Sequence, residues 1–299
     1  MDRARTRHQR GAVLLAVVGV IMVLVMSALA VFALQSNQRK LDMQTSGPAQ
    51  LAVIDNALAQ FVARNRRLPC PANGTVRSGL VNAGMEAINF SNGQCTPANQ
   101  SDGVVPWITL GLSEEQTRDR WHQRISYRVQ PALANNLLTL MNMSWCDPAG
   151  NTGGATGAAN ACAPAPCSGN ACMHPNNYLY GKGLPVQDGT GAWLNQPAPF
   201  WTGLPAAPPV STGAAYVLVA HGANSAGAYD ANANLHGGSP GNSEVPNLNG
   251  QALTGAIIFI DRAPVTASGA TYFDDTLSHP AIATVLERAR LAARTPHLP

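Results

Sequence analysis

The sequence is poor in charged side chains, and the charge that it has is unevenly placed. Only 12% of its 299 residues are Asp, Glu, Lys or Arg, about half of the usual share. The net charge of +3 arises within residues 1–10, because the remainder holds fifteen basic and fifteen acidic residues. Proteins that bind nucleic acids normally carry a surplus of Lys and Arg that displaces counterions from phosphates. The sequence therefore predicts no nucleic-acid partner.

Signatures of common enzyme classes are also scarce. The chain contains no P-loop and no H-E-x-x-H zinc motif. The best catalytic candidate is His221 in AHGAN, with Asp230, Asp261 or Ser225 as candidate partners in a triad. The competing interpretation is that His221 caps a turn after a strand. We therefore expect a protein that is not an enzyme, and keep a membrane-tethered periplasmic hydrolase as the alternative.

One long apolar run lies near the N-terminus. Residues 11–34 carry no formal charge, and Ser27 is the only polar side chain among them. A helix of this length spans roughly 36 Å, enough to cross a hydrocarbon core of about 30 Å. Arginines precede the run closely, whereas Arg39 and Lys40 follow at a greater distance. The positive-inside rule therefore predicts a single-pass membrane protein with a cytoplasmic N-terminus and an exported C-terminal head.

Two simpler interpretations of this run stay open. The first is a cleaved signal peptide, for which Ala28 and Ala30 offer an A-x-A-like site. Apolar regions of signal peptides are usually shorter, at about 7 to 15 residues. The second is a plain single-pass anchor that is not processed.

Helical spacing resumes beyond the apolar run. The SGP stretch at residues 46–48 predicts a break or kink, and Pro69 and Pro71 predict the end of the helix. Asp55 is placed away from the apolar side of the helical wheel, as are Asn56 and Arg64. The predicted apolar stripe consists of Leu51, Ile54, Leu58, Phe61 and Val62. We assign residues 12–45 to a transmembrane helix and its extension, and residues 46–68 to an amphipathic periplasmic helix.

The remainder, residues 69–299, predicts a periplasmic globular head. The runs ISYRV, AAYVLVA and GAIIFI, separated by turn residues, favour an antiparallel sheet. HPAIATVLERARLAAR predicts a C-terminal helix with a proline near its start. The predicted fold class is α+β, with a long N-terminal transmembrane-to-periplasmic helix packed on the antiparallel sheet and with loop-rich insertions.

An even number of cysteines lies on the predicted exported side, which indicates disulfide bonds. They are Cys70, Cys95, Cys146, Cys162, Cys167 and Cys172. We favour Cys70 with Cys95, which closes the loop after the helix. The other four would then staple the Gly-, Asn- and Cys-rich insertion at residues 147–177. A zinc site of Cys162, Cys167, Cys172 and His174 is the alternative, but its spacing is looser than in common structural zinc sites.

The stretch RHQRGAVLLAVVGV at residues 7–20 resembles a type IV prepilin N-terminus. Four further stretches are similar to parts of prepilin-like proteins of type II secretion: LAVIDNALAQFVARNRRLPCPANG, VPWITLGL, YVLVAHGANSAGAY and YFDD. The resemblance implies a pilin-like fold, an inner-membrane location in a bacterium, cleavage after Gly11 by the prepilin peptidase and N-methylation of Ala12. Ala16 stands where the family usually has glutamate, which favours a minor subunit.

The predicted function follows from this resemblance. We expect a minor pilin-like or pseudopilin-like structural subunit of a type II secretion or type IV pilus assembly. Its expected partners are the inner membrane, other pilin or pseudopilin subunits and the prepilin peptidase. An adhesin or binding module is a further alternative. Some pseudopilins bind calcium in a loop, so Asp274 and Asp275 are candidate calcium ligands; no other cofactor is expected.

Overall fold

The structure, a computed structural model, describes residues 22, 25–27, 47–96, 101–134, 143, 183–195, 213–250 and 257–291. The chain divides into two compact units, Met1–Ser46 and Gly47–Pro299. In the first unit, residues 22 and 25–27 are helical and exposed. All elements named below belong to the second unit.

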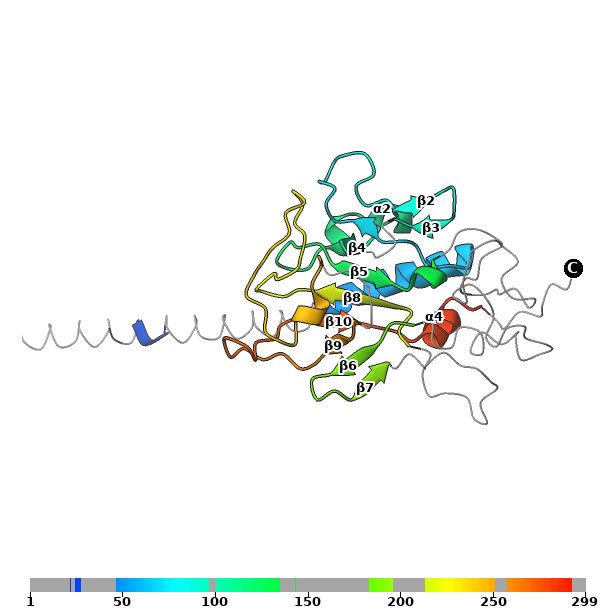
Figure 1. Ribbon diagram of the computed structural model, residues 1–299. Coiled ribbons are helices and arrows are strands. Elements are labelled where there is room, and N and C mark those ends of the chain that lie inside the picture. Colours follow the sequence, from blue (N-terminus) through cyan, green and yellow to red (C-terminus); the bar gives the residue numbers. More distant parts are fainter. Residues whose placement is uncertain are drawn as a thin grey trace, which may run out of the picture. The chain divides into compact units, whose positions relative to one another are not determined.

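A five-stranded antiparallel sheet is the largest sheet of the second unit (Figure 1). Its order is β1 (Ala72–Asn73), β4 (Gly103–Val104), β5 (Ser126–Val129), β8 (Tyr216–Ala220) and β10 (Thr276–Ser278). The register of β5 and β8 runs from Ser126 opposite Val219 to Val129 opposite Tyr216. Every residue of these two strands is buried, which explains why they are rich in β-branched and aromatic side chains.

A smaller sheet has the order β7 (Trp193–Asn195), β6 (Val186–Asp188), β9 (Phe259–Asp261), and β6 runs parallel to β9. A two-stranded hairpin joins β2 (Ile88–Asn89) to β3 (Gln94–Cys95). The short helices are α2 (Trp107–Leu110), η1 (Glu115–Thr117), η2 (Pro131–Leu133), η4 (Val245–Asn247) and α4 (Ile282–Arg288).

Strand β8 separates two apolar clusters, because successive side chains of a strand point to opposite faces. Tyr216 and Leu218 belong to the larger cluster, which also contains buried residues of α4. Val217 and Val219 belong to the second cluster, where they meet Phe259 of β9 and Val186 of β6. Strand β8 therefore links the packing of the two larger sheets.

Residues 47–65 form a helix whose apolar side lies in the larger cluster with β5, β8 and α4 (Figure 1). The sequence analysis placed Asp55 away from the apolar side of the helix, but only 8% of this residue is exposed. The Tyr216 hydroxyl donates a hydrogen bond to Asp55 Oδ1 at 2.8 Å, and the Ser278 hydroxyl donates one to Oδ2 at 2.7 Å. These donors make a buried carboxylate tolerable on the side of the helix that faces the sheet.

A disulfide joins Cys70 to Cys95, which is the pair that the sequence analysis favoured. Nearby, the Arg67 guanidinium donates two hydrogen bonds to the Glu86 carboxylate, at 2.7 and 2.8 Å. The backbone N of Cys70 donates to Glu86 Oε2 at 3.0 Å. The segment that follows the helix is therefore held to β3 by a disulfide bond and to Glu86 by an ion pair.

Two predictions are wrong for the part of the chain that the structure describes. The predicted fold was a long transmembrane-to-periplasmic helix on a sheet. The described residues contain no long apolar helix; apart from the helix at residues 47–65 the helices are short, and the body is mostly β-sheet. Within the described residues, no helix combines the length and the apolar character needed to cross a membrane. This finding also contradicts the predicted single-pass inner-membrane location with a periplasmic head.

Several predicted features lie outside the described residues. They are the processing site at Gly11 and Ala12, the whole insertion at residues 147–177, and the residues Cys146, Cys162, Cys167, Cys172 and His174.

Candidate metal centre

Three carboxylates from two segments of the chain come together beside the sheets. Glu244 directly precedes η4, and Asp274 and Asp275 directly precede β10. One oxygen from each side chain lies within 4.8 Å of the other two. Glu244 is 0% exposed and Asp275 is 3% exposed. We call this group the acidic centre.

The turn after β8 positions Asp274. Its Oδ2 accepts hydrogen bonds from the backbone N of Ala223 at 2.6 Å and of Asn224 at 3.2 Å. Tyr272 Oη also donates to Oδ2, at 2.6 Å. Gly222 has φ +67°, and a Cβ there would lie 2.4 Å from Asp274 Cγ, so glycine allows this close approach. The other carboxylate oxygen, Oδ1, is buried and has no hydrogen-bond partner in the described structure.

Backbone amides hold Glu244 in the same way. Its Oε1 accepts a hydrogen bond from the backbone N of Asp274 at 2.7 Å. Its Oε2 accepts hydrogen bonds from the backbone N of Gly241 at 3.0 Å and from Asn224 Nδ2 at 2.8 Å. Neutral donors therefore fix the position of this carboxylate without cancelling its charge.

Asp275 is the most deeply placed member of the acidic centre. Its Oδ2 accepts a hydrogen bond from Asn247 Nδ2 at 2.8 Å. Its Oδ1 lies 3.7 Å from His221 Nδ1, which is beyond hydrogen-bond distance, and His221 Nδ1 is buried without a partner. Burial raises the pKa of Asp275 well above its usual value, and the Glu244 and Asp274 charges raise it further.

The acidic centre lacks a compensating positive charge among the described residues. Burial also raises the pKa of Glu244, although the hydrogen bonds from Asp274, Gly241 and Asn224 act in the opposite direction. No described arginine or lysine forms an ion pair with any of the three carboxylates. Carboxylate oxygens at this spacing are the donors that Ca²⁺ prefers, and they also suit Mn²⁺. The centre can therefore hold either protons or a divalent cation.

His221 meets other partners than the sequence analysis named. Its Nε2 lies 2.7 Å from Ser126 Oγ, which also accepts a hydrogen bond from Asn249 Nδ2 at 2.6 Å. Ser126, His221 and Asp275 thus follow one another as nucleophile, base and acid do in a hydrolase. Ser126 and His221 are both 0% exposed, so no substrate can reach the hydroxyl in this conformation. Burial, together with the Arg128 charge, lowers the pKa of His221 to about 3.

The predicted partners of His221 lie in other contacts. Asp230 accepts hydrogen bonds from the backbone N of Asn232 and Asn234, and its Oδ2 lies 3.6 Å from His236 Nε2. Asp261 pairs with His279 at 3.1 Å. Ser225 occupies a left-handed turn with φ +54°. The structure therefore does not assemble the triad that the sequence analysis considered.

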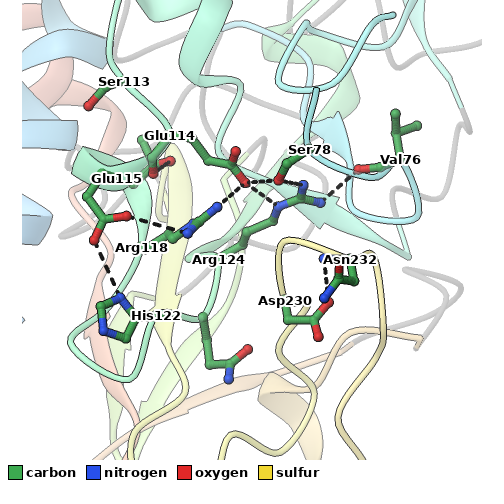
Figure 2. Close-up of polar contacts among 12 residues, drawn as sticks. Val76, Ser78, Ser113, Glu114, Glu115, Arg118, His122, Arg124, Asp230 and Asn232 are labelled. Atoms are coloured by element: carbon green, nitrogen blue, oxygen red, sulfur yellow. Dashed lines mark hydrogen bonds and ion pairs between the residues drawn. The ribbon is translucent and has the colours of Figure 1, made fainter. Parts of the chain in front are cut away.

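A second polar cluster surrounds Arg124, which is 1% exposed (Figure 2). Its Nε donates to Glu114 Oε1 at 3.0 Å, and its Nη2 donates to Ser78 Oγ at 2.9 Å. Its Nη1 donates to the carbonyl oxygens of Gly74 and Val76. Burial alone would raise the pKa of Glu114, but hydrogen bonds from Ser78, Arg118 and Arg124 lower it below its usual value. This cluster is a structural clamp, since its central charges neutralise each other.

One serine motif has the residue spacing of a hydrolase motif but lacks the structural context that such a motif needs. Residues 237–241 read G-G-S-P-G and match the G-x-S-x-G pattern, which the sequence analysis missed. The nucleophile elbow needs a strand before the serine and a helix after it. Residues 236–241 are irregular and Ser239 is exposed, so this context is absent here.

The comparisons with known proteins do not place the chain in a family. No family model matches it, and neither the curated proteins nor the solved structures contain a significant match. Of the calcium candidates, the structure brings Asp274 and Asp275 together with Glu244, which the sequence analysis missed. Glu244 lies thirty residues upstream of Asp274, and no spacing in the sequence connects it with them.

Proposed function

We propose that this protein is a structural subunit of the pilin or pseudopilin kind, which acts by assembling with other subunits. The proposal is carried by the helix at residues 47–65, which packs one side against the sheet and has its other side exposed among the residues that the structure describes. The sequence fragments quoted above support the same class of protein. The burial of Ser126 and His221 favours assembly over hydrolysis.

The uncovered side of this helix suits contact with another subunit. Its exposed residues are uncharged and mostly small as far as Gln60, and the charged Arg64 stands near the C-terminal end: Pro48, Ala49, Ala52, Val53, Asn56, Gln60, Arg64 and Asn65. Small side chains let a second helix approach closely, and the absence of charged exposed residues between positions 48 and 60 lowers the desolvation cost there. Val53 is 44% exposed and lies within this surface.

A photo-crosslinking experiment tests this proposal. A crosslinking amino acid at position 53 is expected to capture a subunit that itself carries a prepilin-type N-terminal segment. The matched control is position 81, another valine, which is 86% exposed and lies in a turn between β1 and β2. Capture from position 53 of proteins without that segment, or no capture from it, would contradict the proposal.

We further propose that the acidic centre binds a divalent cation and that this cation is structural. The supporting observation is that the three carboxylates converge without an arginine or lysine among the described residues. His221 Nδ1, fully buried and without a hydrogen bond, lies 3.7 Å from Asp275 Oδ1. The unpartnered Asp274 Oδ1 is a free donor for the cation. Ca²⁺ fits this set of oxygen ligands.

Calorimetry with Ca²⁺ on the full chain measures this binding. The wild-type protein is expected to bind one ion, and both Asp274→Asn and Glu244→Gln are expected to weaken binding at least ten-fold. Asp188→Asn is the matched control, because Asp188 is a carboxylate at the end of β6 that lies outside the centre. At 100 times the dissociation constant, Ca²⁺ should add about 2.7 kcal/mol to the free energy of unfolding, which EDTA removes. No binding of Ca²⁺ or Mn²⁺ would refute the site.

A further inference from the structure

Large apolar side chains are exposed together in one part of the second unit. Among the described residues of that unit, half of the exposed large hydrophobic residues lie within residues 74–110. We call them the apolar group: Leu80, Val81, Met85, Phe90 and Ile108. Val81 is 86% exposed and Phe90 is 82% exposed. Single exposed apolar residues are common, but several that lie close together mark a site that contacts a protein or a membrane.

The members of the apolar group come from two turns and a helix that contact one another. The backbone N of Ile108 in α2 donates a hydrogen bond to the carbonyl oxygen of Gly84 at 2.9 Å, which holds the first turn beside the helix. The backbone N of Glu86 donates a hydrogen bond to Thr109 Oγ1 at 2.9 Å, and β2 begins two residues later. The β2–β3 hairpin, which carries Phe90, therefore also starts beside α2 (Figure 1). The three segments present their apolar side chains in one region of the surface.

The two turns make backbone hydrogen bonds internally. In the first turn, the backbone N of Met85 donates to the carbonyl oxygen of Asn82 at 3.2 Å. In the hairpin, the backbone N of Gly93 donates to the carbonyl oxygen of Asn89 at 2.7 Å, and Asn89 Oδ1 accepts a hydrogen bond from the backbone N of Ser91 at 2.9 Å. A segment that enters an environment without water has to satisfy its backbone groups within the protein. These hydrogen bonds therefore lower the cost of moving the two turns into an apolar phase.

The charge of these turns is positive. Residues 74–96 contain two charged side chains, Arg77 and Glu86. Glu86 is neutralised by its ion pair with Arg67 at 2.7 Å. Arg77 is exposed, and no described carboxylate forms an ion pair with it. A single positive charge beside exposed apolar side chains complements the negative head groups of anionic phospholipids.

We propose that the apolar group enters the interface of a phospholipid bilayer, with Arg77 at the anionic head groups. Aliphatic and aromatic side chains are stabilised when they leave water for the boundary between head groups and acyl chains. A protein partner would need a surface that matches three separate segments, whereas fluid lipid adapts to them. The contact is peripheral and needs no helix that crosses the bilayer. It goes beyond the proposed assembly with other subunits, which involves the helix at residues 47–65.

Photo-crosslinking to lipid tests this contact on the full chain, reconstituted into vesicles of phosphatidylcholine and phosphatidylglycerol. A crosslinking amino acid at position 81 is expected to form phospholipid adducts, which mass spectrometry detects. The matched control is position 235, where an exposed leucine lies outside the apolar group and about ten-fold fewer adducts are expected. Equal lipid adducts at both positions, or adducts of position 81 with protein instead of lipid, would overturn the inference. Neither result bears on capture from position 53, so the proposed assembly is tested separately.

The role of Arg77 is tested by the lipid composition. Adducts at position 81 are expected to be several-fold more abundant with phosphatidylglycerol than with phosphatidylcholine alone, and high salt should remove this gain because it screens the charge. Arg77→Gln is expected to abolish the difference between the two kinds of vesicle. Arg64→Gln, which changes another exposed arginine, is the matched control and should keep it. A difference that persists unchanged in Arg77→Gln would contradict the contact of Arg77 with anionic head groups.

Discussion

Two groups of buried or half-buried carboxylates in the described structure differ in what surrounds them. Glu86 and Glu114 contact arginines, which neutralise their charge. Asp119 and the acidic centre instead contact backbone amides and neutral side chains. A carboxylate of the second group gains position from its hydrogen bonds but keeps an uncompensated charge. The second group is therefore where pH and cations should affect this protein.

Asp119 is the residue for which we expect the clearest effect of pH on the stability of the protein. Its Oδ1 accepts hydrogen bonds from the backbone N of Trp121 and Gln123, each at 2.9 Å, while Oδ2 is buried without a partner. Burial raises the pKa of Asp119 from 3.8 to about 6. The folded state therefore holds this proton more tightly than the unfolded state. The stability that it contributes is fully present below pH 3.8 and is lost as the pH rises through 6.

Asp119→Asn should make the protein more stable at pH 7, because the amide keeps the Oδ1 acceptor and removes the buried charge. The gain is at most about 3 kcal/mol and should shrink toward pH 4, which urea unfolding at several pH values measures. Asp230→Asn is the control, since Asp230 accepts the same kind of backbone hydrogen bonds but its pKa is lowered. A constant difference between wild type and Asp119→Asn from pH 4 to pH 7 would show that the charge is not the cause.

At the scale of elements, the contact between the helix at residues 47–65 and the sheet contains a polar connection. Asp55→Ala would leave the hydroxyl groups of Tyr216 and Ser278 without an acceptor. Each unpaired buried group costs about 1–3 kcal/mol, so we expect a loss of about 2–4 kcal/mol in urea unfolding. Asn56→Ala, at an exposed position of the same helix, should change stability by less than about 0.5 kcal/mol. A loss below 1 kcal/mol for Asp55→Ala would mean that these hydrogen bonds contribute little.

The positions of strands and helices could largely be predicted from the sequence, whereas the residues that they contact in the fold could not. The runs ISYRV, AAYVLVA and GAIIFI contain β5, β8 and the first two residues of β9, and α4 lies in the predicted C-terminal helix. Periodicity identifies such segments because it reports on local side-chain burial. Asp55 shows the limit of this signal. A polar residue looks exposed on a helical wheel unless the donors that face it, here 161 and 223 residues away, are known.

At the scale of the whole molecule, proteolytic processing gives the most direct test of the pilin proposal. Coexpression with the prepilin peptidase is expected to remove residues 1–11 and leave Ala12 as the N-terminus, because glycine fits closely into a protease groove. Intact-mass measurement of the protein made with and without the peptidase detects this change. The same mass in both preparations would contradict the assignment to the prepilin class.

What the sequence determined by itself is local: the apolar and polar periodicity, the proline and glycine boundaries, and the suggestion that Cys70 lies near Cys95. Tertiary structure alone decided that Glu244 joins Asp274 and Asp275, and that His221 meets Ser126 rather than Ser225 or Asp230. The reason is that β8 stands between β5 and β10 in the sheet, although each of these strands is far from it in sequence. Strand order depends on how the whole chain buries its apolar surface, and no short stretch of sequence carries that information.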